Sequence, residues 1–208
     1  MPVRPADTFV HQNSKTMKSY LVLLFVSVLT WANAQGNYRS AQFSMTIKGT
    51  SNLHDWESVA KEARANGSVT VDAAGTLTAI PSLTVEVPVK SIKSPKGSVM
   101  DNKTYDALKA KSFPNITFKL EKVTNLTKKA DFYDINATGA LTIAGATNKI
   151  DMYVKGKVAA DGSVTFSGSK KLKMTDYKID PPTALFGTMT TGNDIEIVFQ
   201  VVLKQLYN

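Results

Sequence analysis

An all-β domain of antiparallel strands, arranged as a sandwich or a barrel, is predicted by two features of this 208-residue sequence. Apolar and polar residues alternate with period two through most of the chain, as in strands with one buried and one solvated face. Antiparallel sheets show this pattern, whereas parallel strands are usually apolar on both faces. Turn-forming dipeptides separate the alternating segments without long polar linkers, so we expect one domain.

Six segments show the alternation most clearly, and we expect roughly eight or nine strands in all. Turn signals fall at Asn66-Gly67, Ala74-Gly75, Ala144-Gly145 and Asp161-Gly162. The last of these is the clearest and predicts a hairpin with a two-residue turn at positive φ. The apolar rows are Phe43/Met45/Ile47, Leu83/Val85/Val87/Val89, Ile116/Phe118/Leu120, Ile135/Ala137/Gly139/Leu141/Ile143, Ile150/Met152/Val154 and Ile195/Ile197/Phe199/Val201/Leu203.

Two segments interrupt the strand pattern. Residues 101–112 place Tyr105 and Leu108 three apart and precede Pro114, which predicts one short helix in a crossover between strands. The connection 176–193 contains apolar residues, and we expect it to fold back onto the barrel.

Residues 1–34 are predicted to be a leader, within which residues 17–34 form a secretory signal peptide. A basic start precedes an apolar run, and Ala32-Asn33-Ala34 supplies the small residues of a cleavage site. The run is too short for a spanning helix of about 20 residues, and an uncleaved interfacial anchor is the alternative. The mature domain, residues 35–208, is therefore expected to be periplasmic or secreted, and N-terminal sequencing should begin at Gln35.

The amino-acid composition limits the kinds of functional site that the chain can form. The chain has no cysteine, which excludes thiol catalysis, thiolate metal sites and a lipid-modified N-terminus. Its formal charge of +8 falls to about +6 without Arg4, Lys15, Lys18 and Asp7. A basic surface favours anionic partners such as lipid headgroups, and a solvated surface of mixed charge explains the balance equally well. Export argues against nucleic acid.

His54, the single histidine of the mature domain, lies next to Asp55 and suggests a general base with an orienting carboxylate. Neighbours in an extended segment point to opposite faces, however, and a zinc site normally needs three or four ligands. No Gly-x-Ser-x-Gly elbow or Gly-rich phosphate loop occurs. We predict no catalytic residue, metal or cofactor, with His54 fixing the entry to a strand. A hydrolase using His54 is the alternative.

Lysines cluster around the predicted helix. They could bind a phosphate or carboxylate headgroup at a barrel mouth, or they could form a solvated face. The cluster consists of Lys90, Lys93, Lys96, Lys103, Lys109 and Lys111.

Three blocks of sequence, in their order and spacing, resemble the YceI-like family. They are residues 47–56 (IKGTSNLHDW), residues 87–118, which begin VPVKSIKS and end FPNITF, and residues 174–187 (MTDYKIDPPTALFG). The resemblance covers nearly all of residues 37–203. It implies an exported bacterial protein with a lipocalin-like, eight-stranded barrel and no established catalytic residues.

The resemblance also implies that the barrel carries a polyisoprenoid or similar long-chain lipid. We further expect transient contact with a membrane surface. We expect the headgroup near Lys93, Lys96 and Lys103. A barrel fully packed by the same side chains, serving as a structural or interaction domain, is the alternative, and alternation does not separate the two. The residues expected to contact the lipid chain are Phe43, Met45, Trp56, Tyr105, Leu108, Leu141, Met152, Phe166, Phe186 and Phe199.

Overall fold

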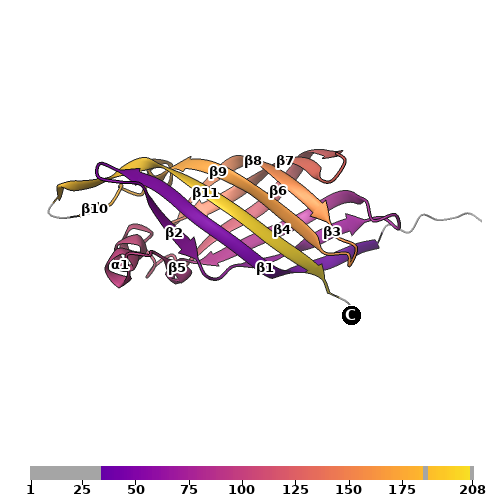
Figure 1. Cartoon of the computed structure of the whole chain (residues 1–208), viewed down its shortest axis with the longest axis horizontal. Coiled ribbons are helices and arrows are strands. Elements are labelled where there is room, and N and C mark those ends of the chain that lie inside the picture. The colour runs from indigo at the N-terminus through magenta and orange to yellow at the C-terminus, as the bar shows by residue number, and fades with distance from the viewer. Residues whose placement is uncertain (1–33, 185–186, 207–208) are drawn as a thin grey trace, which may run out of the picture. The chain divides into compact units, whose positions relative to one another are not determined.

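A computed structural model describes residues 34–184 and 187–206, which form an antiparallel barrel with one α-helix (Figure 1). The elements are β1 (Ala34–Ser51), β2 (Trp56–Ala60), β3 (Arg64–Val71), β4 (Leu77–Pro88), the 3-10 helix η1 (Val89–Ser91), β5 (Ile92–Lys93), α1 (Ser98–Ala107), β6 (Asn115–Lys128), β7 (Tyr133–Ile143), β8 (Ala146–Val158), β9 (Val164–Lys173), the 3-10 helix η2 (Met174–Tyr177), β10 (Thr183–Ala184) and β11 (Met189–Gln205).

The first and last long strands close the barrel. β1 pairs with β11 from Tyr38↔Gln205 to Ser51↔Thr191. The other edge of β1 pairs with β3 along its first half and with β2 along its second half, so β2 and β3 together fill one wall position. The wall therefore has eight positions, and the predicted eight-stranded antiparallel barrel is confirmed. All six predicted apolar rows lie on strands, with only Val89 passing into η1.

Two of the predicted turns differ in the structure. Asn66-Gly67 lies inside β3 rather than in a turn. Asp161-Gly162 does lie between β8 and β9, but residues 159–163 form a longer loop there, closed by a bond from the Ala159 N–H to the Ser163 carbonyl of 2.9 Å. The two-residue turn is instead Ala144-Gly145, where both residues have positive φ (48° and 81°) and Ile143 pairs directly with Ala146.

The helix begins and ends earlier than predicted. α1 starts at Ser98, after Gly97 at φ 84°, and a left-handed Lys109 (φ 52°) lies just beyond its end. Asp101, the first residue of the predicted helical segment, lies inside the helix. Its buried carboxylate accepts a bond of 2.7 Å from the Ser94 N–H and thereby ties α1 to the segment that precedes it.

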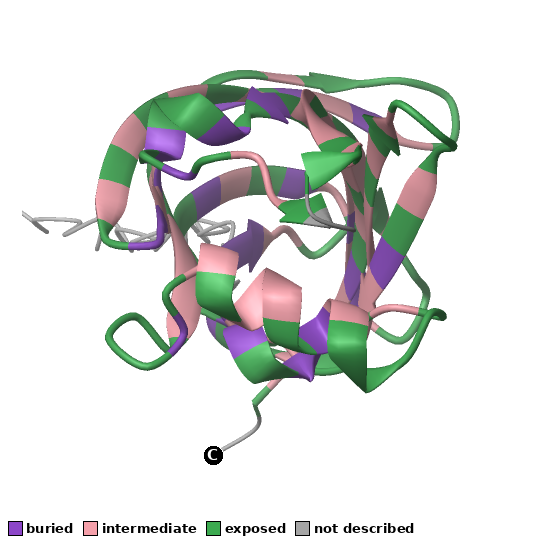
Figure 2. Cartoon of the chain, turned by 90° about the vertical axis from the view of Figure 1, so that its left-hand side faces the viewer, coloured by how far each residue is buried: buried purple, intermediate pink, exposed green. Residues whose placement is uncertain are grey.

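The barrel has two unlike ends. At the closed end, which carries the β3–β4, β6–β7 and β8–β9 connections, large side chains from opposite walls meet in one buried cluster. The cluster includes Tyr38, Leu77, Tyr133, Val164 and Leu203. The other end, called the mouth below, carries α1, η2 and the β1–β2 connection (Figure 2).

Candidate functional site

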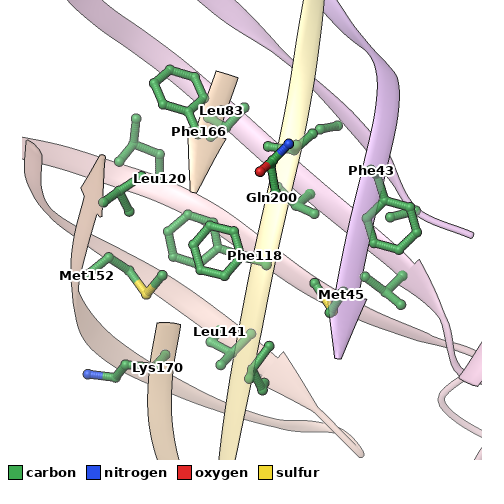
Figure 3. Close-up of a pocket in the computed structure, with 18 of the residues that line it drawn as sticks. Phe43, Met45, Leu83, Phe118, Leu120, Leu141, Met152, Phe166, Lys170 and Gln200 are labelled. Carbon is green, nitrogen blue, oxygen red and sulfur yellow. The ribbon is translucent and has the colours of Figure 1, made fainter. Parts of the chain in front are cut away.

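The middle of the barrel encloses an apolar cavity of about 160 Å³, called the lumen below (Figure 3). Residues of eight wall strands line it, and only Lys170 and the exposed Gln200 among them are polar. The alternation seen in the sequence is the cause, since every second residue of each strand points inside. Six of the predicted lipid-contacting residues lie in this lining: Phe43, Met45, Leu141, Met152, Phe166 and Phe199.

Small residues shape the lumen where aromatic rings lie against the wall. A Cβ on Gly139 would lie 2.5 Å from the ring of Phe118, so only glycine permits that close approach. Ala137, two residues earlier on the same face of β7, also lines the lumen and leaves space at its centre.

A second cavity of about 270 Å³ opens at the mouth. Trp56 and Leu108 line it, as do Lys96 and Lys103. The Trp56 indole N–H donates to the Thr50 carbonyl at 2.9 Å, which fixes the ring across the β1–β2 hairpin. Phe186, which was also predicted to contact the lipid, lies outside the described residues.

The mouth cavity adjoins the lumen. Four isoleucines from different parts of the wall belong to both linings and mark the boundary between the two cavities: Ile47, Ile92, Ile116 and Ile197. The two cavities therefore lie one after the other along the barrel, the inner one apolar and the outer one with polar residues at its rim.

Tyr105 and Lys93 lie outside both linings and bond to each other instead. The Lys93 ammonium donates to the Tyr105 hydroxyl at 2.6 Å and lies 3.4 Å from the Asp101 carboxylate. These two partners, Tyr105 foremost, raise the pKa of Lys93. The Tyr105 hydroxyl can in turn donate to the Lys90 carbonyl, 2.9 Å away. This arrangement fastens α1 to the preceding segment.

The charged groups at the mouth are placed differently from Lys93. The Lys103 ammonium donates to the Thr183 carbonyl at 3.1 Å, whereas Lys96 has no carboxylate partner within the described residues. Lys173, which the sequence did not single out, also lines the mouth. Its ammonium lies 2.8 Å from the Asp194 carboxylate, which raises the pKa of Lys173.

His54 lies on the loop between β1 and β2, where the sequence predicted extended chain. Its ring Nδ1 lies 2.9 Å from the backbone carbonyl of Asp55, not from the carboxylate. The Ser51 hydroxyl holds the loop by donating to the His54 carbonyl at 2.7 Å. Within residues 34–184 and 187–206, no cluster of three metal-ligating side chains occurs.

Tyr177 is a site residue that sequence reasoning missed. It ends η2, is 2% exposed and lines the mouth cavity. Its hydroxyl makes no well-formed hydrogen bond among the described residues. Burial raises its pKa and outweighs the nearby Asn148 side chain, which lowers it. A buried polar group without a partner is unusual and marks a place where a ligand can supply the missing bond.

Comparison with known proteins places this barrel. The family model described as "YceI-like domain" matches residues 31–203. Among solved structures, Burkholderia cenocepacia BcnA is 21% identical with a TM-score of 0.59, covering 77% of this chain and 95% of its own. A polyisoprenoid binding domain from Saccharophagus degradans, implicated in plant cell wall breakdown, is 9% identical with a TM-score of 0.61, covering 83% and 100%.

A Campylobacter jejuni YceI protein is 24% identical with a TM-score of 0.51, covering 73% of this chain and 85% of its own. A comparison with the curated proteins gave no match. Within the described part of the chain, no helix combines the length and the apolar character needed to cross a bilayer.

Proposed function

Because this chain belongs to the YceI-like domain family, we propose that it is an exported carrier that holds one polyisoprenoid or similar long-chain amphiphile inside its barrel. The observation that carries the proposal is the lumen, a space enclosed by the wall and lined almost wholly by apolar side chains. The similar Saccharophagus degradans fold, which is described as polyisoprenoid binding, supports the choice of ligand class.

The energetics favour a long apolar chain. Moving a five-carbon isoprene unit from water into the lumen contributes on the order of 4 kcal/mol gross, at ~0.8 kcal/mol per carbon, before association costs. Such a ligand needs few polar contacts, which agrees with a lining that has only two polar members.

The volume of the lumen limits the size of the ligand that it can hold. The lumen alone is smaller than the usual ligand site of about 300–1,000 Å³, whereas lumen and mouth together reach the lower part of that range. Met45 and Met152 line the lumen, and flexible methionine side chains can move to enlarge it.

A pair of substitutions on one strand tests the proposal. Ala137→Trp fills the centre of the lumen, whereas Ala140→Trp adds the same side chain on the outward face of β7. With retinol as the probe, an isoprenoid alcohol whose fluorescence increases when it leaves water, we expect Ala137→Trp to weaken binding by about a hundredfold or more. Ala140→Trp should bind as the unsubstituted protein does.

Equal retinol affinity in the two variants, both folded by circular dichroism, would refute binding in the barrel interior. If Ala137→Trp does weaken binding, native mass spectrometry of the unsubstituted protein purified from its own host, followed by lipid extraction, would identify the natural ligand.

The headgroup is proposed to lie at the mouth, near Lys96 and Lys103, since both line that cavity. Replacing both with methionine should weaken retinyl phosphate by about two- to tenfold, and less at high salt, because exposed charges contribute little and are screened. Retinol affinity should change less. Lys93→Met is the matched control, because Lys93 is engaged by Tyr105 and Asp101. Equal losses for both ligands would remove the headgroup assignment and leave the carrier intact.

A further inference from the structure

The barrel wall is not fully paired along its length. β8 and β9 are joined from Val158↔Val164 only as far as Val154↔Gly168. Toward the mouth, residues 146–153 of β8 stay paired with β7, and residues 169–173 of β9 stay paired with β11. No ladder pairing joins β8 to β9 over this stretch, which we call the lateral seam.

An outer groove of about 650 Å³ lies over the lateral seam. Ile150 and Lys170 line both this groove and the lumen, so two side chains stand between the lumen and the outside. Tyr177 and Lys173 line both the groove and the mouth cavity. The groove therefore runs beside the interior along the same stretch in which the strands are unpaired.

Lys170 occupies an unusual position in the wall. It follows Phe166 and Gly168 on the inward face of β9, where its neighbours are apolar. A charged ammonium is too costly to leave in an apolar lumen without a partner. The side chain instead crosses the seam, and its ammonium donates to the Asp151 carbonyl of β8 at 2.7 Å. In Figure 3 its nitrogen points away from the other labelled lining residues.

Only side chains span the lateral seam. Besides Lys170, the Asn148 amide of β8 donates to the Asp176 carbonyl of η2, which directly follows β9, at 2.7 Å. The interval between β4 and β6 also has a short ladder, but there the gap is filled by packed side chains of the closed-end cluster, among them Leu77, Ile80 and Leu126. At the lateral seam, Leu172 of β9 is buried in a second cluster with Tyr177, and Ile150 of β8 packs against that cluster. These apolar contacts and the two side-chain bonds stand in place of ladder pairing, and opening the seam requires them to separate while the closed-end cluster stays packed.

We propose that an apolar chain enters and leaves the lumen sideways through the lateral seam, and that Lys170 is the latch of this portal. The inference rests on the proposed function. Sideways entry lets the chain slide in along its length, whereas entry through the mouth requires threading past the four boundary isoleucines. The lysine stem shields the lumen from water when the seam is shut, and its ammonium already lies at the surface when the seam opens.

A reversible bridge across the seam tests the portal. The chain has no cysteine, so Asp151→Cys with Lys171→Cys introduces the only two thiols, on exposed residues of opposite sides of the groove. A bifunctional methanethiosulfonate should then slow retinol uptake and release by about tenfold or more while leaving the final extent of binding unchanged, and reductant should restore both rates. The matched control joins Lys171→Cys to Glu196→Cys, its direct ladder partner in β11, where no seam exists.

The outcomes separate the two proposals. Uptake at the same rate with the seam bridged and unbridged would overturn the portal and leave the carrier standing. Failure of the unbridged, folded protein to bind retinol at all would overturn the carrier and the portal with it.

A second variant tests the latch. Lys170→Ala removes the stem that crosses the seam, and we expect retinol uptake to become about threefold faster or more. Lys122→Ala, which removes an exposed lysine of β6 that lines neither the groove nor the lumen, should leave the rate unchanged. Equal uptake rates in the two variants would show that Lys170 does not close the portal.

Discussion

The closed end and the mouth of the barrel are built from the same strands and the same alternation, yet only one of them is filled. At the closed end Leu203 and Val164 are fully buried, and the Tyr133 hydroxyl accepts a bond of 3.0 Å from the Leu77 N–H. At the mouth, a cavity remains and the equally buried Tyr177 hydroxyl makes no well-formed hydrogen bond among the described residues.

The contrast shows how a single fold divides its tasks. Large side chains that meet across the closed end bury apolar area and satisfy their polar atoms, so that end stabilises the barrel. Toward the mouth, a second cluster that includes Leu172, Met174 and Tyr177 packs around a cavity that remains open. Stability and binding are therefore expected to depend on different residues, which substitutions of the same kind at both ends can test.

The largest difference is expected between two leucine truncations. Leu203→Ala removes a fully buried side chain from the closed-end cluster and should cost about 2–5 kcal/mol of unfolding free energy. Leu83→Ala shortens a half-buried side chain that already borders the lumen, so the loss should be about half as large or less. Urea unfolding monitored by circular dichroism measures both. Similar losses would mean that the lumen is packed as tightly as the closed end.

A smaller difference is expected between two tyrosines that lose only their hydroxyl groups. Tyr133→Phe leaves the buried Leu77 N–H without an acceptor and should cost about 1–3 kcal/mol. Tyr177→Phe removes a hydroxyl that makes no well-formed hydrogen bond among the described residues, so stability should stay the same or rise slightly. Urea midpoints of the ligand-free proteins decide the matter, and a marked loss in Tyr177→Phe would show that its hydroxyl is already engaged.

The smallest effect concerns alkaline pH. Burial raises the pKa of Tyr177 above its ordinary 10.0, so the folded state holds the phenolic proton more tightly than the unfolded state does. That contribution is complete below the ordinary pKa and is lost as pH rises toward the folded-state pKa. Stability measured by urea unfolding should therefore fall less steeply with alkaline pH in Tyr177→Phe than in the unsubstituted protein.

Other groups with raised pKa values titrate in the same direction. A hydrogen bond to Tyr105 raises the pKa of Lys93, one to Asp134 raises that of Tyr153, and one to Asp194 raises that of Lys173. The contribution of Tyr177 is therefore the difference in pH dependence between Tyr177→Phe and the unsubstituted protein. If the stability of both fell equally steeply at alkaline pH, the prediction would be contradicted.

The alternation predicted the strands well because burial of one face fixes which residues point inside. Dipeptide signals predicted turns less well, because glycine has more than one use. Gly67 lies within β3, where a Cβ would come 2.3 Å from the Ser82 carbonyl, so it serves the close approach of two backbones. The Ala144-Gly145 turn was expected, but nothing in its composition marked it as the tight one.

The candidate site was predictable from sequence only where strand alternation determines it. Parity identified lumen residues such as Phe43 and Phe199, since it states which side of a strand they occupy. It could not distinguish an empty interior from a packed one. Lys170 resembles any surface lysine in sequence, and its role depends on a gap between two strands that pair elsewhere. Tyr177 depends on the burial of η2, which no periodicity encodes.

The packed closed end has a consequence for selectivity. A barrel closed at one end selects ligands by chain length. Each added carbon contributes ~0.8 kcal/mol of binding free energy only while it fits inside the barrel. Affinity in a homologous series of alcohols should thus climb with length and then level off, once the tail touches the floor formed by Leu203 and Tyr133. The part of a longer alcohol that does not fit inside would protrude from the mouth, where an acceptor protein or membrane could contact it.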